Sequence, residues 1–168
     1  LKRVPEARAA LEEARDALQE VRRLILDLRP AALDDLGLVP ALRWYGESRL
    51  GPSGTAFTLE VQGHEARLTA PIETVLFRIA QEAMNNIAKH AEARRALLRL
   101  EFLEDRVTAT VEDDGRGFDL EAADSKGGVG LAGMQERASL VGGILTIASL
   151  PEQGTRISVS IPMGELHG

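Results

Sequence analysis

The sequence contains no cysteine in 168 residues, which excludes a disulfide framework and any metal site built from thiolates. Its formal charge of −6 leaves no basic stripe for phosphate neutralisation, so no nucleic-acid partner is expected. No apolar run reaches the roughly 18 to 20 residues of a membrane span, and the charged start does not resemble a signal peptide. These absences predict a cytoplasmic segment without membrane contact, whether or not the intact protein is membrane-anchored.

The residues that are present indicate a globular chain, since 44% are hydrophobic and 27% are charged. A length of 168 residues suits one well-buried domain with an appendage and is short for two full domains. Because the first residues already lie inside a helical pattern, we expect the chain to be a piece of a longer protein.

The first 30 residues carry a heptad seam, in which apolar side chains recur in alternating steps of three and four. The seam consists of Val4, Ala7, Leu11, Ala14, Leu18, Val21, Ile25 and Leu28. The other faces are charged or polar, so an intermolecular bundle is favoured over a helix that folds back on its own domain. Pro30 ends the helix because the residue before a proline is pushed out of the α region.

The rest of the chain alternates between helical and strand patterns. Asp34 or Asp35 can cap a short helix that continues to about Arg49, and Gly51 to Gly54 then break the chain. Its apolar residues are Leu36, Leu38, Leu42 and Trp44. Further patterns predict strands at 56–62, 95–103, 106–113, 144–149 and 155–162, and helices at 71–92 and from Gly127 to about Val141. The second and third strands, and the fourth and fifth, are expected to pair as hairpins.

The helix predicted over 71–92 has an apolar stripe and a polar face beside it. The stripe consists of Ile72, Val75, Leu76, Ile79, Ala80, Ala83 and Ile87. Glu82, Asn86 and Lys89 have the same three-and-four spacing, so an acid, an amide and a cation share one face. Asn is a poor interior helix former, which favours a functional role. On this helix alone, a solvated face is an equally good interpretation.

The strand over 106–113 predicts a buried carboxylate. Val107, Ala109 and Val111 alternate with polar residues, and Asp113 continues their inward parity. A carboxylate at the end of a buried face is costly without a partner, so we interpret it as a ligand acceptor. Asp114 has the opposite parity and is interpreted as a turn residue.

Glycines follow this strand and precede the next helix. Gly115 and Gly117 allow a sharp turn and a close approach to a ligand. Residues 118–127 are polar and aperiodic, and are expected to form a mobile flap. The glycines from Gly127 to Gly130 open a helix whose free N–H groups suit phosphate, although many such turns bind nothing. Thr155 has inward parity at the start of the last strand, which would bring its hydroxyl near Asp113.

Three separate elements therefore suit one ligand. Asp113 offers an acceptor for an exocyclic amino group, and the glycine turn offers amides for phosphate. Mg²⁺ accepts few protein oxygens when phosphates and waters complete its octahedron, so the Asn86 carbonyl suffices as a metal ligand. This set of residues predicts Mg²⁺-ATP as the ligand.

Four motifs in this order resemble the N, G1, G2 and GT boxes of the ATPase superfamily that contains gyrase, Hsp90, MutL and the sensor histidine kinases. They are Glu82-x-x-x-Asn86, Asp113-x-Gly115-x-Gly117, Gly128-x-Gly130-Leu131 and Gly154-Thr155. The resemblance covers about residues 55–162. Longer stretches, such as Gln-Glu-Ala-Met-Asn-Asn-Ile-Ala-Lys-His-Ala and Leu-Arg-Pro-Ala-Ala-Leu-Asp-Asp-Leu-Gly-Leu, resemble the histidine kinases that signal to NarL-type response regulators.

The resemblance implies residue roles. Asp113 would bind the adenine amino group, with Thr155 helping through a water, and Asn86 would ligate Mg²⁺. Lys89 and His90 would contact phosphates. The remaining ATP-binding positions would be Gly115, Gly117, Gly128, Gly130 and Leu131. Glu82 is the catalytic candidate. The acid at the matching position activates water in the wider superfamily, whereas in histidine kinases it would only order the waters of the metal.

The resemblance also implies a fold. We expect an α+β, two-layer α/β sandwich of the Bergerat type, in which a mixed, mainly antiparallel sheet of about five strands lies under three helices. Residues 1–30 would be the second helix of a dimerisation hairpin, 31–54 a connecting helix and linker, and 55–168 the catalytic ATP-binding domain.

The implied function is transfer of the ATP γ-phosphoryl group to a histidine upstream of the given chain, since residues 1–30 contain none. His64 lies in a predicted turn and His167 in the tail. The intact protein would be a homodimer through its N-terminal helix. Alternatives are a serine-directed anti-sigma-factor kinase, another ATPase of the superfamily, or an interaction module that binds nucleotide without chemistry.

Overall fold

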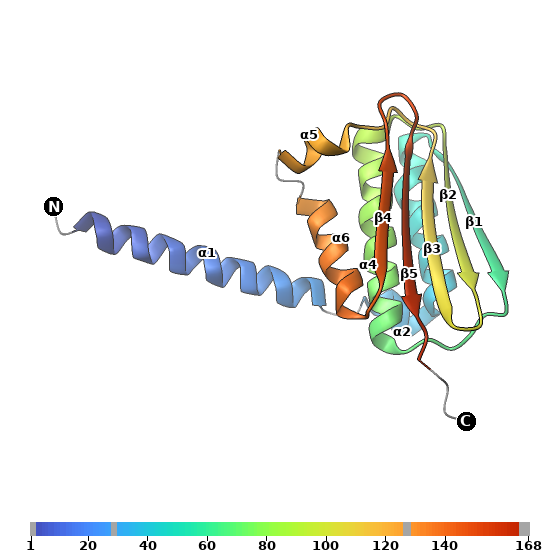
Figure 1. Ribbon diagram of the computed structural model, residues 1–168, viewed down its shortest axis with the longest axis horizontal. Coiled ribbons are helices and arrows are strands. Elements are labelled where there is room, and N and C mark those ends of the chain that lie inside the picture. The colour runs from blue at the N-terminus through green and yellow to red at the C-terminus, as the bar shows by residue number, and fades with distance from the viewer. Residues whose placement is uncertain (1–2, 28–29, 126–128, 165–168) are drawn as a thin grey trace.

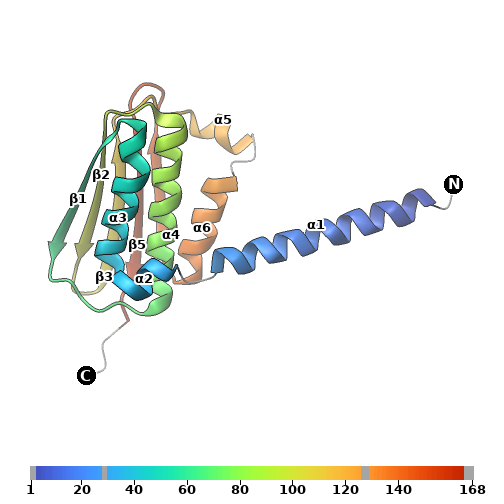
Figure 2. The ribbon, with the colours of Figure 1, turned by 180° about the vertical axis from the view of Figure 1, so that it is seen from behind.

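A five-stranded sheet with helices on one face forms the body of the protein, and helix α1 (Arg3–Asp27) runs away from it in Figures 1 and 2. This computed structural model describes residues 3–27, 30–125 and 129–164, with the backbone alone at 19–27, 124–125 and 129. The sheet and its helical layer confirm the predicted two-layer α+β sandwich. No helix in those ranges is long and apolar enough to cross a membrane.

The sheet has the strand order β1-β2-β3-β5-β4. In chain order its strands are β1 (Ala56–Gly63), β2 (Arg95–Phe102), β3 (Arg106–Asp113), β4 (Ile144–Ser149) and β5 (Thr155–Pro162). The first pair, β1 and β2, is parallel and the other neighbours are antiparallel, so the sheet is mixed as predicted. Parallel neighbours need a crossover connection, and α4 (Ala70–Asn86) supplies it. Both predicted hairpins are confirmed.

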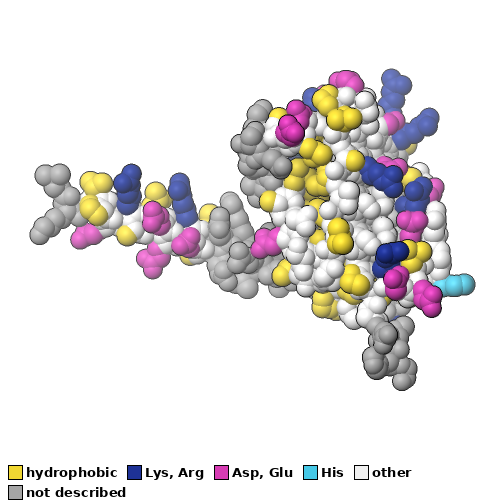
Figure 3. Space-filling model, in the orientation of Figure 1, with side chains coloured by type: hydrophobic (Ala, Val, Ile, Leu, Met, Phe, Trp, Pro, Cys, Tyr) yellow, Lys and Arg dark blue, Asp and Glu magenta, His cyan; other side chains and the backbone are white. Residues whose placement is uncertain are grey.

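The core lies between the sheet and three helices. In Figure 2, α4 runs between α3 (Leu38–Leu50) and α6 (Val129–Leu140). Leu76 and Met84 of α4 are fully buried, as are Leu98 on β2 and Val159 on β5. The uncovered sheet face carries charged residues of both signs (Figure 3), including the ion pairs Arg99–Glu60 and Arg156–Glu112. The alternation of apolar and polar residues along the strands therefore decides which face is covered.

The helix predicted to begin at Asp34 or Asp35 is two helices, so that prediction is wrong. Both aspartates lie inside α2 (Ala31–Leu36), and α3 begins after Gly37 without a side-chain cap. Gly37 has φ +81 and ψ 172, a combination that only glycine adopts readily. A helix cannot continue through that conformation.

Helices α2 and α3 belong to the same core as the sheet. Leu33, Leu38 and Leu42 are buried in the cluster that also holds the residues of α4, whereas Leu36 and Trp44 are about half exposed. The segment predicted to connect two parts of the chain thus contributes directly to the packing of the second part.

The helix predicted over 71–92 is not a continuous α-helix. It is α-helical to Asn86, and Ile87–Ala91 form a π-turn, η2, that ends at Glu92 in the left-handed conformation. A π-turn carries more residues per turn than an α-helix, so side chains on either side of Asn86 no longer follow a 3.6-residue period.

The segment predicted as an aperiodic flap contains a short helix, α5 (Leu120–Ser125). Asp119 caps it, since its Oδ1 accepts the N–H of Glu121 at 3.0 Å. The remainder of the predicted flap, at 126–127, and Gly128 lie outside the described residues, as does the tail from 165. Gly142 and Gly143 end α6, where the Gly143 N–H reaches the Ala138 carbonyl at 2.8 Å.

The seam of α1 is exposed wherever its side chains are described. Val4, Leu11 and Leu18 are 67%, 54% and 52% accessible, although large apolar residues in a helix this regular normally pack against another helix. The side chains of Val21, Ile25 and Leu28 lie outside the described part of the chain.

Because α3 packs into the core, two alanine variants should differ in stability. Leu42→Ala removes a fully buried side chain and should lower the free energy of unfolding by about 2–5 kcal/mol. Leu36→Ala, whose side chain is 49% exposed on α2, should lower it by less than about 1 kcal/mol. Urea unfolding followed by circular dichroism checks both, and equal effects would contradict the packing of α3 into the core.

Candidate functional site

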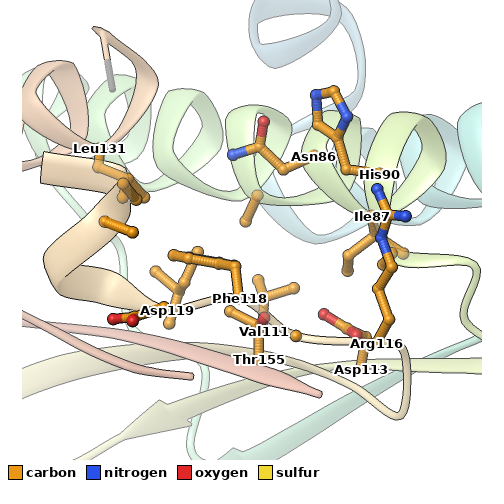
Figure 4. A pocket seen from close by; sticks show the side chains of 16 residues that line it. Asn86, Ile87, His90, Val111, Asp113, Arg116, Phe118, Asp119, Leu131 and Thr155 are labelled. Atoms are coloured by element: carbon orange, nitrogen blue, oxygen red, sulfur yellow. The ribbon is translucent and has the colours of Figure 1, made fainter. Parts of the chain in front are cut away.

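A cavity of about 890 Å³ opens between the sheet and the end of α4. This volume lies within the roughly 300–1,000 Å³ of small-molecule sites. Its lining residues are Ala83, Asn86, Ile87, His90, Ala91, Val111, Asp113, Arg116, Gly117, Phe118, Asp119, Ala122, Ala123, Leu131, Thr155 and Ile157. Figure 4 shows Asn86 and His90 on the helical side of the cavity and Asp113 and Thr155 on the sheet side.

Asp113 closes β3 and lies half-buried at the floor of the cavity. Its Oδ1 accepts the N–H of Gly115 at 2.8 Å. Burial raises the pKa of the Asp113 carboxyl, the nearby Asp114 adds to this effect, and the Gly115 hydrogen bond opposes it. One hydrogen bond does not saturate a carboxylate, which has about four lone-pair sites. Asp113 can therefore accept from a ligand donor.

Thr155 lies beside Asp113, as the inward parity of both residues predicted. The two are register partners on β5 and β3, and both line the cavity. The Thr155 hydroxyl also shares a hydrogen bond of 2.9 Å with Ser149. The last strand thus brings a hydroxyl to the carboxylate from a distant part of the sequence.

Ser149 is a supporting residue that the sequence analysis missed. It is buried, accepts the Phe118 N–H at 2.9 Å and donates to the Gly154 carbonyl at 3.0 Å. It therefore ties the loop after β3 to the turn between β4 and β5. A signal was present, because Ser149 ends β4 at the parity of the partly buried Leu145 and Ile147, just as Asp113 ends β3.

The predicted glycines fit the loop against its own chain. A Cβ on Gly115 would lie 2.3 Å from the Ala91 carbonyl oxygen, which accepts the Arg116 N–H at 2.8 Å. Gly117 has φ +59, and a Cβ there would lie 2.1 Å from the Leu150 carbonyl oxygen. The missing side chains therefore allow the loop to seat between η2 and the last hairpin. Gly117 also lines the cavity, whereas Gly115 packs against Ala91.

Glu82, Asn86 and Lys89 were predicted to share one helix face. Of these three residues, Asn86 lines the cavity. Lys89 is exposed and outside the lining, and His90 lines the cavity at the next position. The wider turn of η2 accounts for this change of phase. Glu82 lies against the start of α6 instead, where a Cβ on Gly130 would be 2.6 Å from its Oε1.

The loop after β3 adds residues that the sequence analysis did not single out. Phe118 extends the apolar wall formed by Val111, Ile157 and the predicted Leu131 of α6. Arg116 contributes a cation, 54% exposed and 3.7 Å from a Glu92 carboxylate oxygen. Side-chain directions in a loop follow no period, so no pattern in the sequence identifies these residues.

Asp114 is more than the turn residue that was predicted. Its Oδ1 accepts the N–H groups of Arg94 and Arg95 at 2.8 and 2.9 Å. These two hydrogen bonds join the end of β3 to the start of β2, and they lower the pKa of the Asp114 carboxyl. The residue thereby fixes the backbone next to Asp113.

The cavity is lined by His90, Asp113 and Asp119, but these side chains do not form a metal site by themselves. In the ranges that the structure describes, no group of three or more His, Cys, Asp or Glu side chains is placed to hold a metal ion. An amide oxygen such as that of Asn86 suits a hard cation whose other ligands are phosphate and water oxygens.

A known family matches the part of the chain that builds this cavity. The family described as histidine kinase-, DNA gyrase B-, and HSP90-like ATPase matches residues 72–165, more than half of the chain. The matched range includes every residue that lines the cavity, from Ala83 at the end of α4 to Ile157 on β5.

Curated relatives extend the likeness towards the N-terminus. The chain is 41% identical over 140 residues to the signal transduction histidine-protein kinase/phosphatase DegS of Bacillus subtilis, a match that covers 80% of this chain and 36% of that protein. It is 42% identical over 136 residues to the corresponding kinase/phosphatase UhpB of Salmonella typhimurium, over 80% of this chain and 26% of that protein. The chain thus spans about a third or less of the length of these relatives.

A solved structure has a similar fold. The structure of full-length ShkA in complex with AMPPNP has a TM-score of 0.62 and 25% sequence identity, over 72% of this chain and 29% of that chain.

The hydrogen bonds of Asp114 predict a pH-dependent contribution to stability. Its pKa is lowered on folding, so the contribution is fully present above the ordinary value near 3.8 and is lost as the pH falls through the lower folded value. Asp114→Ala should therefore cost about 1–2 kcal/mol at neutral pH, discounted for exposure, and progressively less as the pH falls below that ordinary value. Urea unfolding from pH 3 to 7 measures this difference.

Asp105→Ala is the matched control, because that exposed carboxylate lies 3.8 Å from Arg106 in a surface ion pair. It should change stability by less than about 0.5 kcal/mol. A loss of stability in Asp114→Ala that stays constant down to pH 3 would contradict the role of the carboxylate.

Proposed function

Because the chain belongs to the family of histidine kinase-, DNA gyrase B- and HSP90-like ATPases, we propose that it is the catalytic part of a two-component sensor histidine kinase. The cavity binds Mg²⁺-ATP, and the γ-phosphoryl group passes to a histidine on a segment upstream of Leu1. The γ-phosphorus gains a bond to the histidine nitrogen and loses its bond to the bridging oxygen, which leaves with ADP. The likeness to DegS and UhpB over 80% of the chain supports this proposal.

One observation carries the proposal. The carboxylate that ends β3 and the amide that ends α4 line one cavity, although Asp113 and Asn86 come from separate elements. A carboxylate accepts hydrogen bonds from an exocyclic amino group, and an amide oxygen suits a hard cation. A purine nucleotide with a metal-bound phosphate chain could use both groups, the carboxylate for the base and the amide for the metal.

The sheet side suits the adenine ring. Asp113 has acceptor sites beyond the one used by Gly115, and Thr155 adds a hydroxyl beside it. Val111 and Ile157 provide apolar contacts for the faces of the ring, and Phe118 offers an aromatic partner from the loop. The raised pKa of Asp113 reflects a partly desolvated carboxylate, which a ligand donor would stabilise.

The helical side suits the phosphates. Asn86 would hold Mg²⁺ through its amide oxygen, while His90 and Arg116 of the lining would supply hydrogen-bond donors. Lys89, outside the lining, would add positive charge. A metal ion held by Asn86 would supply positive charge against the charge that develops on the phosphates. The protein's part is then to orient the triphosphate and to exclude water, which is the usual means of catalysing phosphoryl transfer. Glu82, beside the start of α6, would order the waters of the metal.

The glycine positions complete the proposed site. Gly115 and Gly117 seat the loop below the nucleotide. Gly128 and Gly130 would present backbone N–H groups to phosphate, and Leu131 contributes to the wall of the cavity. Gly130 leaves the space in which the Glu82 carboxylate lies.

We propose two protein partners. The intact protein is a homodimer whose subunits meet through the seam of α1. The seam residues Val4, Leu11 and Leu18 are exposed in a single chain and would be buried by a partner helix. The phosphorylated histidine then passes its phosphoryl group to a NarL-type response regulator, as the sequences of the motifs imply.

Replacement of Asp113 tests nucleotide binding. Asp113→Asn should weaken Mg²⁺-ATP binding about 10- to 100-fold in isothermal titration calorimetry, because a hydrogen bond to a charged acceptor is lost. The unfolding midpoint should stay equal or rise, since a carboxylate whose pKa is raised on folding costs stability at neutral pH. Glu112→Gln, on the same strand but paired with Arg156 on the uncovered face, should bind as wild type. Equal heats from all three proteins would remove Asp113 from its role.

Phosphoryl transfer is tested with a longer chain that includes the upstream histidine. Incubation with γ-labelled Mg²⁺-ATP should give a phosphoprotein that is labile in acid and stable in base, which is typical of phosphohistidine. Asn86→Ala should reduce the labelling rate at least tenfold because the amide ligand of Mg²⁺ is lost. An acid-stable phosphoserine on a partner protein would instead identify a serine-directed kinase.

A further inference from the structure

A polar contact joins α3 to the end of α4 outside the cavity. The Tyr45 hydroxyl and the Arg49 Nε both donate to Oδ1 of Asn85, at 3.1 and 2.5 Å. Arginine has no acceptor, so the oxygen of the Asn85 amide must face α3. We call Tyr45, Arg49 and Asn85 the α3 clamp.

The clamp holds the backbone where the regular helix ends. Asn85 immediately precedes Asn86, and the π-turn begins at Ile87, whose N–H points to the carbonyls of both Ala83 and Met84. A shared donor of this kind does not select one helical register. The direction of Asn86 and His90 therefore needs a second constraint, and the clamp is placed to supply it.

The same N-terminal segment also holds the far end of the π-turn. The buried Thr55 donates its hydroxyl to the Ala93 carbonyl at 3.0 Å, and the Ala56 N–H donates to the Arg94 carbonyl at 2.9 Å. Residues 45–56 thus form hydrogen bonds to Asn85 before η2 and to Ala93 and Arg94 after it, although none of them lines the cavity.

We propose that Tyr45 and Arg49 are positioning residues that act through Asn85 to hold Asn86 and His90 in the orientation that binds metal and phosphate. The inference rests on the proposed function and extends it to residues outside the region matched by the family. The Tyr45 ring packs edge-on against Phe77 with centroids 5.9 Å apart, which fixes the direction of its hydroxyl. Burial raises the pKa of Tyr45, so the hydroxyl keeps the proton that it donates.

The clamp acts on one half of the site. Asp113 and Thr155 lie on β3 and β5, whereas the clamp contacts α4 directly before Asn86. Loss of the clamp should therefore weaken contacts with metal and phosphate while leaving the adenine contacts intact. A general loss of packing between α3 and α4 would weaken both.

The test compares two ligands in variants of the given chain. Tyr45→Phe keeps the ring on Phe77, and Arg49→Met keeps the stem of the side chain, so each removes mainly a donor. Each should reduce Mg²⁺-ATP affinity by about three- to tenfold in calorimetry, as expected for one hydrogen bond, with adenosine affinity unchanged in an NMR titration. Arg49→Lys restores a donor and should recover at least half of the lost binding free energy.

Four further variants make the test specific. Asn85→Ala should match the loss seen in the double variant Tyr45→Phe/Arg49→Met, and Tyr45→Phe added to Asn85→Ala should cause no further loss, because both donors act through one oxygen. Arg43→Met is the control, since Arg43 is an exposed residue of α3 outside the clamp. It should bind both ligands as wild type.

Three results overturn the inference. They are unchanged Mg²⁺-ATP affinity in Tyr45→Phe and Arg49→Met, an equal loss of adenosine affinity, and a further loss when Tyr45→Phe is added to Asn85→Ala. A wild-type chain that binds adenosine but not Mg²⁺-ATP, or neither ligand, would overturn the proposed function itself. The wild-type titration therefore separates the two failures.

Discussion

The partly desolvated carboxylate of Asp113 is the constraint on which the rest of the site depends. An acid at the end of an apolar strand face raises the free energy of the folded protein unless donors surround it. The surrounding structure supplies one backbone donor from Gly115 and a neighbouring hydroxyl from Thr155. The remaining acceptor capacity faces the cavity, so the protein is arranged for a ligand that donates hydrogen bonds at this point.

The second requirement is an irregular end to α4. A continuous α-helix would place Glu82, Asn86 and Lys89 along one line, but the π-turn replaces Lys89 with His90 at the cavity. Such turns are energetically poor in isolation and persist when other contacts hold them. Here Thr55, Asp114 and the α3 clamp hold the backbone on either side of η2. The two halves of the site are thus supported by different parts of the fold.

Features that depend on a repeating period could be predicted from the sequence, whereas features that depend on tertiary contacts could not. Alternation along β3 placed Asp113 on the inward face, and the parity of β5 brought Thr155 beside it. The break at Gly37 and the π-turn interrupt a periodic pattern, and α5 is too short to show one. The predicted boundaries of these segments were therefore wrong. Ser149, Arg116 and the donors to Asn85 are defined by packing between distant segments, for which a single sequence carries little signal.

The position of β5 in the sheet has a consequence for biosynthesis. This strand is the last in the chain, yet it lies between β3 and β4 and also carries Thr155. A nascent chain on the ribosome therefore cannot close its sheet until residues 155–162 have emerged, because β4 pairs with β5 and β3 has no other neighbour on that side. Translation that stops before this strand should yield a product in which the sheet is open and the cavity is incomplete.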